Sequence, residues 1–173
     1  MSDPIAPPSV LAMSPALVGD DSIFMTAPHG KDGRLLKLLP PRSAAEKVSS
    51  EELWTTPLDT CQGGVIHAHG RIYGSYYAGR KGWAALDAKT GAILYQNPDL
   101  IKGAALLADQ RLYTLSEDGW MRLLEPTATE FKNHGQFRFA KAQNDAWAHP
   151  VIHNRRLYLR YHETLTCYDL RGE

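Results

Sequence analysis

The stretch Gly70-Arg71-Ile72-Tyr73 recurs along the chain as Gln110-Arg111-Leu112-Tyr113 and Arg155-Arg156-Leu157-Tyr158, and more weakly as Asp21-Ser22-Ile23-Phe24. Each copy opens a short apolar run directly after turn-forming residues, as a strand after a tight hairpin does. The copies recur at a spacing of about 40–50 residues, which is typical of a four-stranded propeller blade. Since one blade cannot bury its faces without neighbours, this repeat predicts the architecture of the whole chain.

Working outward from these openings, short runs rich in β-branched, Leu and aromatic residues predict fifteen strands and an all-β fold. We expect a Pro-rich segment over residues 1–11, then four antiparallel blades over residues 12–58, 59–98, 99–140 and 141–173. The last strands of the first and third blades are expected at residues 53–58 and 136–140. The fourth blade lacks an outer strand in this reading. Residues 40–52 are expected to form a long loop that contains at most one helical turn, starting at Ser43.

Composition excludes several functional classes. The 173 residues carry a formal net charge of zero, and no Lys/Arg run suggests binding to nucleic acid or anionic membranes. No signal peptide is visible at the start, and no apolar run has membrane-spanning length. The two cysteines are too few for a disulfide scaffold and are interpreted as free thiols.

A second motif follows the pattern A-x-D-x-x-T-G-x-x-x-W with Tyr in the Trp place, and its positions are Ala85, Asp87, Thr90, Gly91 and Tyr95. Asp is suited to capping a turn and Gly to a positive φ. Trp54 fits the same aromatic place in the first blade. The motif resembles the repeat of pyrroloquinoline-quinone (PQQ)-like β-propellers, a superfamily that includes quinoprotein dehydrogenases and the outer-membrane assembly lipoprotein BamB. Residues 59–65, 147–152 and 159–169 are similar to the C-terminal half of bacterial PQQ-like repeat proteins.

This resemblance implies a half-ring or fragment of an eight-bladed propeller and a periplasmic or secreted location. It also implies that the outer-strand aromatics pack between blades, so Trp54, Trp83, Tyr95 and Trp120 are expected to be largely buried. Quinoproteins of this type hold PQQ and Ca²⁺, often beside a vicinal disulfide. The chain has no such disulfide and no recognisable Ca²⁺ loop, so neither PQQ nor Ca²⁺ is expected for this chain alone.

Candidate ligand-binding residues follow from propeller geometry, because sites form from loops that precede inner strands and loops that join second to third strands. These loops supply a mixed polar and aromatic funnel rim: Cys61, Gln62, Lys102, Trp147, His149, Tyr77, Arg80 and His162. A packed free thiol is the simpler reading of Cys61, since no base lies nearby in sequence. His67 and His69 form a weak two-ligand pattern. No catalytic or metal-ligating residue is assigned.

Three hypotheses remain at this point. The favoured one is a non-catalytic PQQ-like propeller module that binds a protein or carbohydrate partner. The alternative is part of a quinoprotein-type oxidoreductase whose cofactor site lies outside this chain. The third is a structural half-ring. Four blades leave open blade faces, so we expect a homodimer that completes a ring, or additional blades in a longer protein. Closure as a four-bladed monomer would need residues 4–10, whose prolines remove hydrogen-bond donors.

Overall fold

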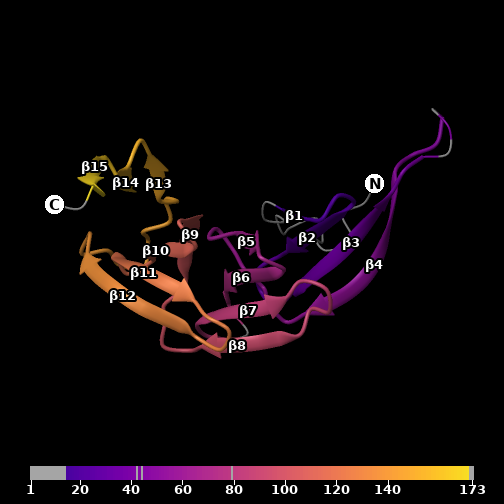
Figure 1. The fold of residues 1–173 in the computed structure, drawn as a ribbon, viewed down its shortest axis with the longest axis horizontal. Coiled ribbons are helices and arrows are strands. Elements are labelled where there is room, and N and C mark those ends of the chain that lie inside the picture. The colour runs from indigo at the N-terminus through magenta and orange to yellow at the C-terminus, as the bar shows by residue number, and fades with distance from the viewer. Residues whose placement is uncertain (1–14, 42, 44, 79, 172–173) are drawn as a thin grey trace.

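The computed structural model describes residues 15–41, 43, 45–78 and 80–171, and these form fifteen strands in four antiparallel sheets (Figure 1). Each sheet is a meander in chain order, called here blades 1 to 4. Blade 1 comprises β1 (Ala16–Val18), β2 (Ser22–Thr26), β3 (Gly33–Leu39) and β4 (Ser49–Thr56). Blade 2 comprises β5 (Val65–Ala68), β6 (Arg71–Ser75), β7 (Trp83–Asp87) and β8 (Ile93–Asn97). Blade 3 comprises β9 (Gly103–Ala108), β10 (Arg111–Ser116), β11 (Trp120–Pro126) and β12 (Phe131–Arg138). Blade 4 comprises β13 (Val151–His153), β14 (Arg156–Tyr161) and β15 (Thr164–Asp169). The expected all-β architecture is therefore confirmed.

Two-residue hairpins join the first and second strands of blades 2, 3 and 4. Their central residues all have positive φ: His69 (51°) with Gly70 (71°), Asp109 (48°) with Gln110 (61°), and Asn154 (49°) with Arg155 (58°). Two successive positive values define the turn whose twist matches that of antiparallel strands. This shared turn explains why the repeat is easiest to see where the second strands begin.

The hydrophobic core lies between neighbouring blades rather than within any one of them. Each interface between two neighbouring blades is called here a joint. Phe24 and Leu35 of blade 1 meet Ile72 and Leu86 of blade 2. The next joint, between blades 2 and 3, centres on Tyr73, Trp83, Leu112 and Leu124. The third joint packs Leu115 and Met121 against Leu157 and Leu159. The inner strands β1 and β5, and then β5 and β9, are also in contact, so the blades fan out into an open arc (Figure 1).

The outer strands β4 and β12 differ from the prediction, because they begin earlier and carry β-bulges. In β4 the register shifts so that Leu35 pairs with Trp54 and Leu36 with Glu52, which leaves Leu53 extra. The equivalent shift in blade 2 leaves Leu94 extra, and in blade 3 it leaves His134 extra. An inserted residue reverses the in-and-out alternation on which strand prediction relies. The three bulges fall at the same place in every four-stranded blade.

The expected burial of the four aromatics is most complete for Trp83, and the other three also keep most of their surface covered. Trp83 is buried, with 2% of its surface exposed. Trp54, Tyr95 and Trp120 are partly exposed, and Trp54 and Tyr95 pack against the apolar clusters of the blade joints. The equivalence of Trp54 and Tyr95 is confirmed, since they pair with Leu35 and Ala85 at matching places in the third strands. Both residues lie on the outermost strands of their blades.

The turn after β7 forms as the A-x-D-x-x-T-G motif predicts. One carboxylate oxygen of Asp87 accepts hydrogen bonds from the amides of Lys89 (3.0 Å) and Thr90 (2.8 Å) and from the Thr90 hydroxyl (2.9 Å). These bonds hold the pKa of Asp87 below its ordinary value. The turn ends at Gly91 with a φ of 74°, a conformation that favours glycine.

The expected long loop of blade 1 is shorter than predicted. β4 begins at Ser49, so residues 49–52 of that loop are strand. The amide of Glu46 donates to the carbonyl of Ser43 (3.1 Å), which is a turn and not a helix. The Pro-rich segment of residues 1–11 lies outside the described residues.

Candidate functional site

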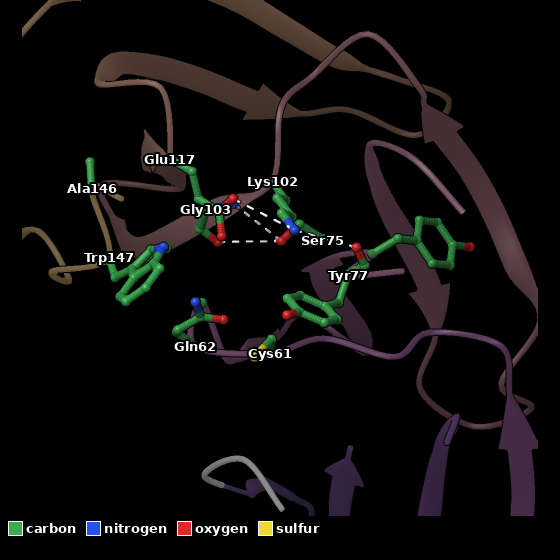
Figure 2. A pocket seen from close by; sticks show the side chains of 12 residues that line it. Cys61, Gln62, Ser75, Tyr77, Lys102, Gly103, Glu117, Ala146 and Trp147 are labelled. Carbon is green, nitrogen blue, oxygen red and sulfur yellow. Dashed lines mark hydrogen bonds and ion pairs between the residues drawn. The ribbon is translucent and has the colours of Figure 1, made fainter. Parts of the chain in front are cut away.

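A pocket forms at one end of the joint between blades 2 and 3 (Figure 2). Its walls come from the loops that precede β5, β9 and β13 and from the ends of β6 and β10. Among the residues that line it are Cys61, Gln62, Tyr77, Lys102, Glu117 and Trp147. Five of these six were predicted from propeller geometry.

A buried carboxylate shapes the loop that carries Tyr77. Asp59 is only 1% exposed, and its two oxygens accept hydrogen bonds from the amides of Gly30 (3.0 Å), Tyr77 (2.9 Å) and Ala78 (3.1 Å). Gly30 belongs to blade 1 and Tyr77 to blade 2, so this carboxylate ties two blades together. Buried polar groups with satisfied hydrogen bonds fix a local conformation, and here that conformation sets the position of the Tyr77 ring.

Hydroxyl groups join the inner ends of consecutive blades. The Thr60 hydroxyl donates to the carbonyl of Ser75 (2.9 Å), and the Thr26 hydroxyl donates to the carbonyl of Thr60 (3.1 Å). The amide of Gly103 donates to the Ser75 hydroxyl (3.3 Å). These bonds hold the pocket walls on a rigid base.

An ion pair lies inside the pocket. The Lys102 ammonium is 3.6 Å from a carboxylate oxygen of Glu117, and it also donates to the carbonyl of Tyr77 (3.4 Å). The same ammonium sits over the Tyr77 ring, 4.2 Å from its centroid, as a cation–π contact requires. Glu117 is only 8% exposed. This burial raises the pKa of its carboxyl, against the opposing effects of the Lys102 charge and the Trp147 indole.

Glu117 was missed by the sequence reasoning. It follows Ser116 at the end of β10, in a loop that joins a second strand to a third, and Asp118 lies next to it. Asp118 accepts a hydrogen bond from the Ser116 hydroxyl (2.6 Å). Aligning the repeats would have found it. Glu117 and Tyr76 occupy equivalent positions, since each immediately follows a buried serine at the end of a second strand.

Cys61 is a free thiol in the pocket wall. Burial raises its pKa from the ordinary value, and the nearby Lys102 charge only partly opposes this effect. A nucleophilic cysteine needs the opposite shift, because the thiolate is the reactive form. Cys61 is therefore a packing group rather than an activated nucleophile. Cys167 is also free and lies exposed on β15.

Trp147 and His149, in the segment before β13, bring blade 4 to the rim. Trp147 borders the pocket, and 53% of its surface is exposed (Figure 2). His149 Nε2 lies 2.8 Å from the carbonyl oxygen of Gln62. This contact joins the start of blade 4 to the start of blade 2 and passes over blade 3. His149 therefore belongs to the rim through Gln62.

Arg80 and His162, also expected at the rim, do not line this pocket. Arg80 lines a neighbouring cleft, where its guanidinium lies 5.9 Å from the centroid of the Tyr76 ring. His162 lies in another hollow that Trp147 also borders, and its Nε2 is 3.2 Å from a carboxylate oxygen of Asp145.

The described residues contain no group of three or more His, Cys, Asp or Glu side chains arranged to hold a metal ion. His67 is half-buried on β5, and His69 occupies the left-handed turn after it. Within the described ranges, no helix has the length and hydropathy needed to cross a bilayer.

Comparison with solved structures assigns the fold. The chain is similar to BamB from Moraxella catarrhalis, with a TM-score of 0.63 over 89% of this chain and 14% sequence identity. The chain has a β-propeller fold. It spans 41% of the length of that structure. No protein-family model matches the sequence. No curated protein sequence matches it either.

Proposed function

We propose that this chain is a non-catalytic, PQQ-like propeller module whose rim binds a protein partner. The observation that carries the proposal is Trp147, a large aromatic residue that is 53% exposed beside a pocket with a buried ion pair. Tryptophan, tyrosine and arginine dominate binding energy in protein interfaces. The rim offers two anchors, Trp147 in the segment before β13 and Tyr77 in the loop after β6.

The chemistry of the pocket supports binding rather than catalysis. The Cys61 thiol has a raised pKa, and the Lys102–Glu117 pair neutralises itself. The enclosed space admits no more than about one water molecule. A planar cofactor such as PQQ does not fit such a space, so we derive no quinone step for this chain.

A protein is favoured over a carbohydrate as the partner, because the pocket between the anchors has room for only about one water molecule. Carbohydrates and other small ligands usually sit in open hollows that enclose most of their surface. Likeness to the BamB fold also agrees with a protein-binding module in the periplasm. That location is part of the proposal.

Site-specific photo-crosslinking tests the proposal. Benzoylphenylalanine is placed at position 147, and in a matched control at position 94, in the host of the protein. Leu94 is an exposed apolar residue on the outer bulge of blade 2. We expect a discrete protein adduct at 147 that is absent at 94. Equal adducts at both positions, or none at 147, would contradict a protein-binding rim, and an adduct identified as glycan would favour a carbohydrate partner.

A further inference from the structure

The outer strands of the first three blades place one equivalent residue opposite the third strand. Trp54 pairs with Leu35 in blade 1, and Tyr95 pairs with Ala85 in blade 2. In blade 3 the position opposite Leu123 is Gly135. Each of these residues lies next to the bulge in its strand. The row of aromatic rings is therefore interrupted at blade 3.

The two rings that are present each close the outer end of a joint to the next blade. A Cβ atom added to Gly91 of blade 2 would lie 2.4 Å from a carbon of the Trp54 ring, so that ring rests directly on the glycine. The Tyr95 ring meets Phe131 of blade 3 edge to face, with 5.0 Å between centroids. An aromatic ring thus covers the outer end of the joint between blades 1 and 2, and another covers the joint between blades 2 and 3.

At the joint between blades 3 and 4, the position equivalent to Trp54 and Tyr95 is Gly135 and carries no ring. A Cβ atom added to Gly135 would meet nothing within 4 Å. An apolar hollow of about 390 Å³ opens there, and its walls include Tyr113, Met121, Gly135, Phe137, Leu157 and Leu170. Phe137 does not take the vacant place, because it pairs with Met121 and packs on Tyr168 (centroids 4.9 Å apart). Phe137 and Leu170 remain 38% and 37% exposed.

We propose that this hollow, called here the Gly135 slot, binds an aromatic side chain of a protein partner. The sibling joints indicate the occupant, since both are covered by a flat ring held on an outer strand. The slot shares no lining residue with the rim pocket, so it is a second site that is independent of the proposed rim function.

The polar groups at the slot suit an aromatic residue in a peptide. The half-buried Arg122 guanidinium lines the slot and donates to the Gln136 side chain (3.1 Å) and to the Ser116 hydroxyl (2.9 Å). The same guanidinium lies 5.8 Å from the centroid of the chain's own Trp120 ring, so this wall of the slot already combines a cation with an aromatic face. The remaining N–H groups of Arg122 and the amide of Gln136 are suited to the peptide groups that flank such a ring.

The test uses N-acetyltryptophanamide as the probe and the amide resonances of the 173-residue chain as the readout. We expect saturable shifts at Gly135, Phe137 and Leu170. Gly135→Trp fills the slot with a ring of the chain itself. The affinity of this variant for the probe is expected to be lower than that of the wild type by a factor of at least about ten. The matched control is Gly135→Thr, which also replaces glycine in a strand but leaves the slot open, and it is expected to bind like the wild type.

A second variant covers the case in which Gly135→Trp does not fold. Leu170→Asp puts a charge on an exposed wall of the slot. It is expected to lower the affinity for the probe by a similar factor to Gly135→Trp. N-acetylleucinamide is expected to bind much more weakly than the aromatic probe. Equal binding of the two amides, unchanged affinity in both slot variants, or saturable shifts with maltose and not with the aromatic probe would overturn the proposal.

Discussion

At the scale of single residues, the most informative side chain is Glu117. Its carboxyl is buried against Lys102, and burial raises its pKa above the ordinary value of 4.5. The folded protein therefore holds this proton more tightly than the unfolded chain does. Stability falls as pH rises from the unfolded pKa through the folded pKa of Glu117.

Replacing Glu117 with Gln removes this proton-linked cost. We expect the free energy of unfolding of Glu117→Gln, relative to wild type, to increase as pH rises above about 4.5 and then to level off. Denaturant titrations of both proteins across this range measure the difference, with the exposed Glu51→Gln as control. Parallel stability curves for Glu117→Gln and wild type would show that the buried carboxyl is not coupled to folding.

One pocket brings together five of the residues predicted for the rim, because strand starts and strand ends are visible in the sequence as turns: Cys61, Gln62, Tyr77, Lys102 and Trp147. Sequence reasoning could not find Glu117, since burial of a charged residue depends on a partner from another loop. It also could not separate Arg80 and His162 from the rim, because the paths of their loops are decided by contacts between blades.

At the scale of elements, the turn between β7 and β8 reverses the chain and also forms part of the interface between blades 1 and 2. Gly91 and Gly70 share positive φ values of 74° and 71°, but only Gly91 lies against a ring, that of Trp54. These two glycines form a matched pair for substitution by alanine.

We expect both alanine variants to lose about 1–2 kcal/mol through left-handed backbone strain. Gly91→Ala is expected to lose about 1–3 kcal/mol more, because its Cβ would overlap the Trp54 ring. Thermal and denaturant unfolding measure both losses. Equal destabilisation of the two variants would mean that the Trp54 ring can move aside without loss of stability, and that its contact with Gly91 does not stabilise the interface between blades 1 and 2.

The inner and second strands were predictable, because their alternation is regular and two-residue turns bound them. The outer strands were not. Leu53, Leu94 and His134 are bulge residues, and each reverses the alternation in mid-strand, so the predicted bounds of β4 and β12 shifted. The degree to which Trp54 is buried depends on its contact with Gly91 of blade 2, which no local pattern in the sequence encodes.

At the scale of the whole molecule, the described blades form an open arc with exposed apolar residues on blade 4. Leu165 is 67% exposed on β15, and Val151 is 52% exposed on β13. Such residues beside an outermost strand favour association.

We expect the 173-residue chain to self-associate as its concentration rises. Leu165→Glu is expected to reduce this association, whereas Leu53→Glu, on the outer bulge of blade 1, is expected to leave it unchanged. Sedimentation velocity over a concentration series measures the effect. A compact monomer at every concentration would exclude the expected pairing of blade faces.

A separate expectation concerns PQQ. The rim pocket has room for about one water molecule, and the described residues provide no three-member group of His, Cys, Asp or Glu ligands. We therefore expect isothermal calorimetry with PQQ and Ca²⁺ to show no binding in the micromolar range. Tight, stoichiometric heat release would revive the quinoprotein interpretation.

The contact between His149 and the carbonyl of Gln62 has a mechanical consequence. It acts as a chord across the arc, since it connects the second and fourth blades without involving the third. A chord of fixed length sets the curvature of the blades that it spans. We therefore expect bending of the arc to displace the Gln62 loop as well.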